Sequence, residues 1–67
     1  MEKYSKFYRE AYDYMERHIK LKNAAAAAED INVVSRKYRN NRFLVDLLTV
    51  AFNELCRSYF TSEQVAL

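Results

Sequence analysis

The sequence predicts an all-α domain, a small bundle of three or four helices that is completed by homodimerisation. The chain of 67 residues contains neither glycine nor proline, the residues on which tight β-hairpins and phosphate-cradling loops depend. Its apolar residues recur at helical spacing in three segments. A chain of this size buries only about 60% of its unfolded surface. A lone monomer would therefore be marginal, and self-association is the expected support.

Residues 3–22 predict the first helix. On a helical wheel of 100° per residue, the apolar and the polar side chains of this segment occupy opposite halves. Asp13 stands four residues before Arg17, which is the favourable order for an ion pair on a helix surface. His18 lies on the apolar half, and we interpret it as a packed, hydrogen-bonded histidine. The aromatic residues on that half are Tyr4, Phe7, Tyr8, Tyr12 and Tyr14.

Two further helices are expected at residues 24–38 and 42–60. The first of them opens with five alanines, which have the highest helix propensity, and we expect a break near Asn32, where the apolar pattern changes phase. In a chain without glycine, asparagine is the residue best suited to the left-handed conformation at helix ends. The other asparagines that mark expected joints are Asn23, Asn40 and Asn41. The tail, residues 61–67, is expected to fray.

The apolar arc of residues 42–60 is wide. It covers about half of the helix circumference, whereas one neighbouring helix requires a stripe of only about 100°. We therefore expect this helix to pack on two partners, one of them in a second copy of the chain. The residues expected to divide between the core and the homodimer interface are Leu44, Leu48, Phe52, Leu55 and Tyr59.

Composition argues against catalysis and against a bound cofactor. Cys56 is the only cysteine and His18 the only histidine, so we expect neither an internal disulfide nor a metal site. Without a glycine-rich loop to hold a nucleotide, we expect no cofactor, no catalytic residues and no enzyme activity. A single cysteine fits a reducing compartment, and no apolar run reaches the roughly 18 residues of a membrane span. We expect a cytoplasmic protein with no membrane partner.

The segment SRKYRNNRF, residues 35–43, concentrates positive charge: four cations fall within seven positions, while the net charge of the chain is only +2. Residues 24–42 fit a helix-turn-helix motif with Ala28 at the close contact and Asn32 in the turn. Its second helix would cover about 34–42. The motif predicts a small DNA-binding regulatory protein whose partner is double-stranded DNA. The expected nucleic-acid-binding residues are Ser35, Arg36, Lys37, Arg39, Asn40 and Arg42.

Three alternatives compete with this interpretation. The cations also suit a plain joint between two helices, because positive side chains in a last helical turn interact favourably with the helix dipole. A non-enzymatic adaptor or inhibitor would instead dock a protein partner through the aromatic face or the basic segment. A basic surface for single-stranded RNA would use Tyr38 for base stacking. A segment that contacts DNA bases must protrude from the fold, whereas a joint between two helices can be partly covered.

Overall fold

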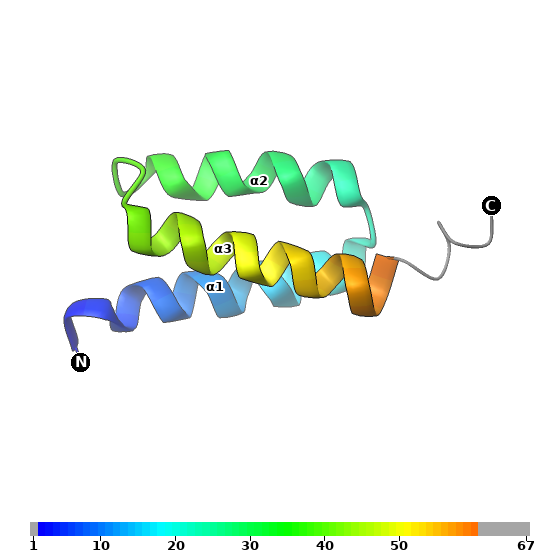
Figure 1. Ribbon diagram of the computed structural model, residues 1–67, viewed down its shortest axis with the longest axis horizontal. Helices are drawn as coiled ribbons and strands as arrows, with labels where there is room; N and C mark the ends of the chain where they lie inside the picture. The colour runs from blue at the N-terminus through cyan, green and yellow to red at the C-terminus, as the bar shows by residue number, and fades with distance from the viewer. Residues whose placement is uncertain (1, 61–67) are drawn as a thin grey trace.

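The structure is a computed structural model that describes the backbone of residues 2–60 and the side chains of residues 4–60. Within this part of the chain it contains three α-helices and a closing π-helical turn: α1 (Glu2–Leu21), α2 (Ala24–Arg36), α3 (Arg42–Leu55) and η1 (Cys56–Phe60). The all-α prediction is confirmed, and the tail predicted to fray lies outside the described residues. α1 and α3 run in the same direction and α2 in the opposite one (Figure 1). None of the described helices is long and apolar enough to cross a membrane.

The core lies between the three helices, and α3 contributes the largest part of it. Leu44, Leu48 and Leu55 have no exposed surface, because α3 packs against both α1 and α2. Of the residues predicted to divide between the core and a homodimer interface, these three leucines therefore belong to the core of the single chain. Of the other predicted interface residues, Phe52 is partly buried and Tyr59 is 41% exposed.

Lys22 and Asn23 form the joint between α1 and α2. Lys22 takes the left-handed conformation (φ 52°), and its N–H donates to His18 O (3.0 Å), which ends α1. Asn23 has an extended backbone, and its side-chain oxygen accepts a hydrogen bond from Ala26 N (3.0 Å). Asn23 therefore acts as the N-cap of α2. The joint lies where the sequence predicts it, but the left-handed residue is the lysine and not the asparagine.

α2 continues without interruption from Ala24 to Arg36, so the predicted break near Asn32 is wrong. Asn32 is exposed on the surface of the helix. Its polar side chain is hydrated there, so the helix does not need to end at this residue. The close contact predicted for Ala28 is also misplaced. Ala27 is the alanine with no exposed surface, whereas Ala28 is exposed.

Tyr14 ties α1 to α2 through a buried hydrogen bond. Its hydroxyl donates to Ala27 O (2.7 Å), and its side chain is fully buried. Burial, together with the nearby carboxylate of Asp30, raises the pKa of Tyr14 to about 12. The hydroxyl therefore keeps its proton, and with it the hydrogen bond, across the neutral and mildly alkaline range.

We expect Tyr14→Phe to lower the free energy of unfolding by about 1–2 kcal/mol, because the buried carbonyl of Ala27 loses this donor. Urea unfolding followed by circular dichroism measures the change. Tyr12→Phe is the matched control, since the Tyr12 side chain is 62% exposed and its effect should stay within about 0.5 kcal/mol. Equal effects of the two substitutions would contradict the role of the buried hydroxyl.

Candidate nucleic-acid interface

The turn between α2 and α3 has the geometry of a Schellman motif. Asn40 N donates to Ser35 O (2.9 Å) and Arg39 N donates to Arg36 O (3.2 Å), the two hydrogen bonds that define this helix ending. Arg39 and Asn40 both lie in the left-handed region, with φ of 57° and 56°. Arg39 thus occupies the position where glycine is usual, at a cost of about 1–2 kcal/mol for a residue with a Cβ.

The helix predicted at 34–42 does not form, so the predicted helix-turn-helix is wrong. The end of α2 and a turn at residues 37–40 occupy this segment, and α3 begins at Arg42. The two left-handed residues of the turn prevent α2 from continuing. Asn41 then caps α3, because its side-chain oxygen accepts a hydrogen bond from Leu44 N (3.1 Å). The segment is a turn at one end of the bundle (Figure 1) and contains no recognition helix.

Five of the six predicted contact residues come together on or beside this turn. The exposed ones are Arg36, Lys37, Arg39, Asn40 and Arg42. Ser35 is the exception, because its side chain faces the core and it is only 2% exposed. The prediction that Ser35 contacts nucleic acid is therefore wrong. Its carbonyl instead accepts the hydrogen bond that closes the turn.

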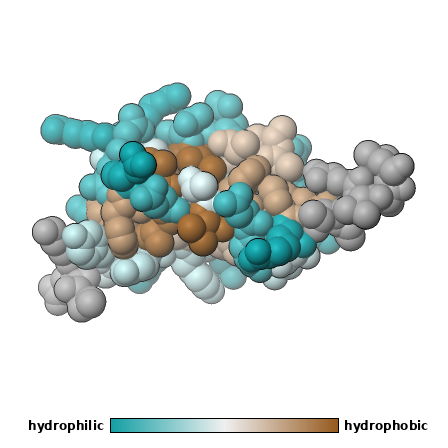
Figure 2. Space-filling view, viewed as in Figure 1, coloured by the Kyte–Doolittle hydropathy of each residue, from teal (hydrophilic) through white to brown (hydrophobic). Residues whose placement is uncertain are grey.

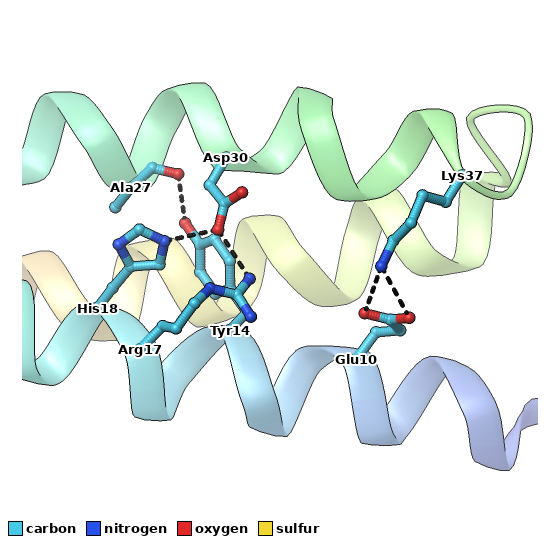
Figure 3. A network of polar contacts seen from close by, with 7 residues as sticks. All are labelled: Glu10, Tyr14, Arg17, His18, Ala27, Asp30 and Lys37. Carbon is cyan, nitrogen blue, oxygen red and sulfur yellow. Dashed lines mark hydrogen bonds and ion pairs between the residues drawn. The ribbon is translucent and has the colours of Figure 1, made fainter.

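Two of the four cations have a carboxylate partner. Lys37 Nζ lies 3.3 Å from Glu10 Oε2 and links the turn to α1 (Figure 3). Arg42 Nε lies 3.3 Å from Asp46 Oδ1, one turn further along α3. The Lys37 and Arg42 side chains are 57% and 88% exposed. An ion pair between exposed side chains, such as Arg42–Asp46, contributes only about 0–1 kcal/mol, so Arg42 can exchange its carboxylate for a phosphate at small cost. The Glu10 side chain is only 17% exposed, but it keeps the hydrogen bond from Tyr38 when Lys37 leaves it.

Arg36 and Arg39 have no carboxylate partner among the side chains of residues 4–60. Both side chains are exposed: Arg36 ends α2, and Arg39 lies in the turn that the Schellman hydrogen bonds hold closed. A guanidinium group presents several N–H donors in one plane, which suits the oxygens of a phosphate. These two arginines are therefore the strongest candidate anion contacts on the turn.

Tyr38 is held by its own fold. Its hydroxyl donates to Glu10 Oε2 (2.7 Å), and its ring lies edge-on to Phe7 with 5.4 Å between the ring centres. The hydrogen bond to Glu10 raises the pKa of Tyr38. Lys6 Nζ lies over the ring, 5.6 Å from its centre. These contacts engage the hydroxyl and the ring, so Tyr38 does not offer the free stacking surface that an RNA base requires.

Lys6 is a further cation of this region that was not among the predicted contact residues. Its Nζ contacts the Phe7 and Tyr38 rings, which places it beside the turn although it belongs to the first helix. A signal exists in the sequence, because Lys6 precedes Glu10 by four residues and shares its side of the helix. Only the fold shows that this part of α1 meets the basic segment.

Positive charge is concentrated at one end of the bundle. Residues 4–10 and 36–46, which we call the basic end, carry six lysines and arginines against two carboxylates. Residues 11–35 and 47–60 carry four cations against five carboxylates. Figure 2 shows hydrophilic side chains projecting beyond the bundle at the end where the α2–α3 turn lies. A surface of one sign attracts an oppositely charged partner and increases the rate of association.

A second polar cluster lies between α1 and α2, away from the basic end (Figure 3). Asp30 Oδ2 accepts hydrogen bonds from Arg17 Nη2 (2.8 Å) and from His18 Nε2 (2.7 Å), and His18 is only 3% exposed. Burial raises the pKa of Asp30, but these two hydrogen bonds and the Arg17 charge outweigh it and hold the pKa below its ordinary value of 3.8. The expectation of a packed, hydrogen-bonded His18 is confirmed.

This second cluster links α1 to α2, and its role is structural. Both partners of Asp30 come from α1, so the carboxylate is already engaged and links two helices. Among the described residues, no three histidine, cysteine, aspartate or glutamate side chains are grouped so as to hold a metal ion. The basic end is therefore the stronger candidate for a functional surface.

The chain was compared with protein-family models, with curated proteins and with solved structures, and none of them matches it.

Proposed function

We propose that the protein is a small, non-enzymatic DNA-binding regulator that holds the phosphate backbone of duplex DNA with its basic end. The observation that carries the proposal is the pair of exposed guanidinium groups, Arg36 and Arg39, which lack a carboxylate partner among the described side chains. The backbone hydrogen bonds of the turn and the hydrogen bond from the Tyr38 hydroxyl to Glu10 hold the segment that carries them. Phosphate contacts of this kind supply most of the affinity of non-specific DNA binding.

Each phosphate that a cation neutralises releases a condensed counterion, so binding must weaken steeply with salt. Arg36 and Arg39 are available without breaking an ion pair. Arg42 gives up an exposed partner, and Lys37 gives up Glu10, which keeps its hydrogen bond from Tyr38. Three or four such contacts predict a decrease in affinity of about 40- to 150-fold between 50 and 200 mM salt. Because these cations lie on a turn and at a helix end, and not on a recognition helix, we expect contacts to phosphates without base readout, so that binding depends on charge and not on sequence.

Fluorescence anisotropy with a labelled duplex of random sequence tests the proposal directly. We expect a dissociation constant in the range of about 10⁻⁴ to 10⁻⁶ M, together with the steep salt dependence given above. The measurement needs no knowledge of a target site, because the electrostatic contribution is the same for every sequence. Absence of binding at 50 mM salt and about 100 µM protein would contradict the proposal, since the expected dissociation constants are equal to or smaller than that concentration.

Arg39→Gly should separate the structural cost of this residue from its proposed function. Glycine adopts the left-handed conformation without the Cβ penalty, so we expect the free energy of unfolding to rise by about 0.5–1 kcal/mol. Loss of one phosphate contact should reduce the salt slope by about one and weaken duplex binding about tenfold at 50 mM salt. Unfolding by urea and fluorescence anisotropy measure the two effects on one variant.

Lys22→Gly is the matched control. Lys22 is also a left-handed cation at a helix end (φ 52°), but it lies in the α1–α2 joint, at the other end of the bundle. This variant should gain similar stability and lose the same unit of charge, while its affinity for duplex DNA changes by no more than about twofold. Equal loss of binding in Arg39→Gly and Lys22→Gly would show that net charge matters and that the basic end does not.

The alternative function is docking to a protein partner, as an adaptor or inhibitor. The observation that favours it is the set of large exposed apolar side chains outside the basic end, among them Tyr12 at 62% and Val50 at 66%. Surfaces enriched in tyrosine are typical of protein interfaces. The expected homodimer belongs to the same class of interaction, and it requires exposed residues, because Leu44, Leu48 and Leu55 lie in the core of the single chain.

A further inference from the structure

α1 and α3 share an outer face that is apolar and unusually exposed. Tyr8 is 52% exposed and packs edge-on against Phe43 of α3, with 5.8 Å between the ring centres. Tyr4 contacts the same ring at 4.6 Å. Hydrophobic side chains also reach the surface over α3 on the side seen in Figure 2. A monomeric protein rarely leaves a continuous apolar surface of this kind uncovered.

Helical spacing extends this face along both helices. Tyr12 follows Tyr8 by four residues on α1, while Leu47 and Val50 follow Phe43 by four and seven on α3, so they lie on the same sides of their helices. Tyr12 and Val50 are among the most exposed apolar side chains of the described chain. We define the outer face as Tyr8, Tyr12, Phe43, Leu47 and Val50.

Charged residues border the outer face in an order that suits a second copy. Arg9 and Glu16 are both exposed and have no ion-pair partner among the described side chains. They are seven residues apart, two helical turns, and therefore lie on one side of α1. If α1 of a second copy packs antiparallel, Arg9 faces Glu16 of the second copy and Glu16 faces its Arg9. The midpoint of this pairing falls between residues 12 and 13.

The aromatic contacts show which residue of α3 lies level with this midpoint of α1. Phe43 contacts both Tyr4 and Tyr8, so it lies at the level of residue 6 of α1. α1 and α3 run in the same direction (Figure 1), and both rise by about 1.5 Å per residue. Val50, seven residues beyond Phe43, therefore lies at the level of residue 13. The two-fold axis that the Arg9–Glu16 pairing places on α1 therefore also lies beside Val50 on α3. Val50 is the most exposed large apolar residue of α3.

We propose that the outer face binds a second copy of the chain, with α1 antiparallel to α1 and α3 antiparallel to α3 about a two-fold axis beside Tyr12 and Val50. Such an isologous interface buries the same apolar surface twice and forms two symmetric Arg9–Glu16 ion pairs. Of the basic end, Tyr8, Arg9 and Phe43 enter this interface, whereas the α2–α3 turns of the two copies lie at opposite ends of the dimer and remain uncovered. The inference concerns self-association alone, so it stands or fails independently of DNA binding.

Sedimentation velocity over a range of concentrations, without DNA, tests this interface. We expect the unmodified chain to be a dimer at micromolar concentration. Val50→Asp should weaken dimerisation at least 100-fold, because it places two carboxylates beside the axis in an apolar contact. Val33→Asp is the matched control: Val33 is 49% exposed but lies on α2, outside the outer face, and its variant should dimerise like the unmodified chain.

Charge exchange tests the antiparallel order. Arg9→Glu and Glu16→Arg should each weaken dimerisation about tenfold, because two ion pairs are lost and like charges meet twice. The double variant restores opposite charges across the axis and should recover the original affinity. Circular dichroism checks that each variant is folded. A monomer at all concentrations would overturn the proposal, as would a dimer that Val50→Asp and the single charge variants leave intact.

Discussion

Replacing Leu48 with alanine is expected to lower the free energy of unfolding by about 3–4 kcal/mol. Leu48 has no exposed surface and lies on the side of α3 that packs against both other helices. Truncating a leucine at such a site costs the lost burial and leaves a cavity, typically about 2–5 kcal/mol in total. The whole stability of a 67-residue chain is on the order of 3–10 kcal/mol, so this one substitution should remove a large part of it.

Urea unfolding at low protein concentration measures this effect on the fold of the single chain. Val33→Ala is the control, because Val33 is exposed on α2 and its truncation should change the free energy of unfolding by less than about 0.5 kcal/mol. The result also separates core from interface. A Leu48→Ala variant that dissociated into stable monomers would contradict the packing, since it would place Leu48 between subunits.

Asp30→Ala is expected to cost about 2–4 kcal/mol, the second large effect. Asp30 Oδ2 is the partner of both Arg17 Nη2 and His18 Nε2. Hydrogen bonds to a charged group contribute about 1.5–3 kcal/mol each. The loss at His18 is the larger one because this ring is nearly completely buried. The Arg17 side chain is 47% exposed, so its contribution is reduced by solvent screening.

Glu29→Ala is the matched control for this substitution. Glu29 is the neighbouring carboxylate on α2, it is exposed, and the structure gives it no ion pair among the described residues. We expect its free energy of unfolding to change by less than about 0.5 kcal/mol. Comparable losses in the two variants would show that the acidic charge of α2, and not the tie to α1, determines stability.

The same tie predicts how stability depends on pH. The pKa of Asp30 is lower in the folded chain than its ordinary value of 3.8, so in the acid range the folded state binds fewer protons than the unfolded state. The contribution of Asp30 is therefore complete above its unfolded pKa and is lost as the pH falls through its lowered folded pKa. Unfolding free energies measured from pH 6 to pH 2 should decrease less steeply for Asp30→Ala than for the unmodified chain.

The helices and most of their joints were predictable, because local physics determines them. The absence of glycine and proline and the 3.6-residue periodicity both favour helices. Asn23 and Asn41 were correctly placed at joints, since short polar side chains satisfy the free N–H groups at a helix start. Asn32 was misread because an exposed asparagine inside a helix has the same pattern as one at a joint.

Of the three left-handed residues that follow the helices, Asn40 was predicted, but Lys22 and Arg39 were not predictable from composition. Lys22 and Arg39 take the left-handed conformation, although nothing in their side chains favours it. The helices must turn back at these points to bury their apolar faces, and this tertiary requirement outweighs a local penalty of about 1–2 kcal/mol. The misplaced helix at 34–42 has the same origin, because the propensity of its residues does not reveal the turn that the packing of α3 requires.

The candidate site was predictable in part. The exposed cations of the turn follow from a local concentration of charge, and five of the six residues come together. Lys6 was missed because its proximity to the turn depends on how α1 and α2 pair. Ser35 was misplaced for a related reason: the side of α2 that faces α3 depends on tertiary packing, and Ser35 lies on it.

The contact surface itself is tested most directly by ¹H–¹⁵N correlation spectra recorded while a random duplex is added at low salt. We expect the amide resonances of residues 36–42 and of Lys6 to shift progressively and to return when salt is raised. The resonances of Tyr12 and Val50 on the outer face, and of Asp30 between α1 and α2, should keep their positions. Shifts centred on the outer face, or no shifts at any ratio of duplex to protein, would contradict the claim that the basic end holds DNA.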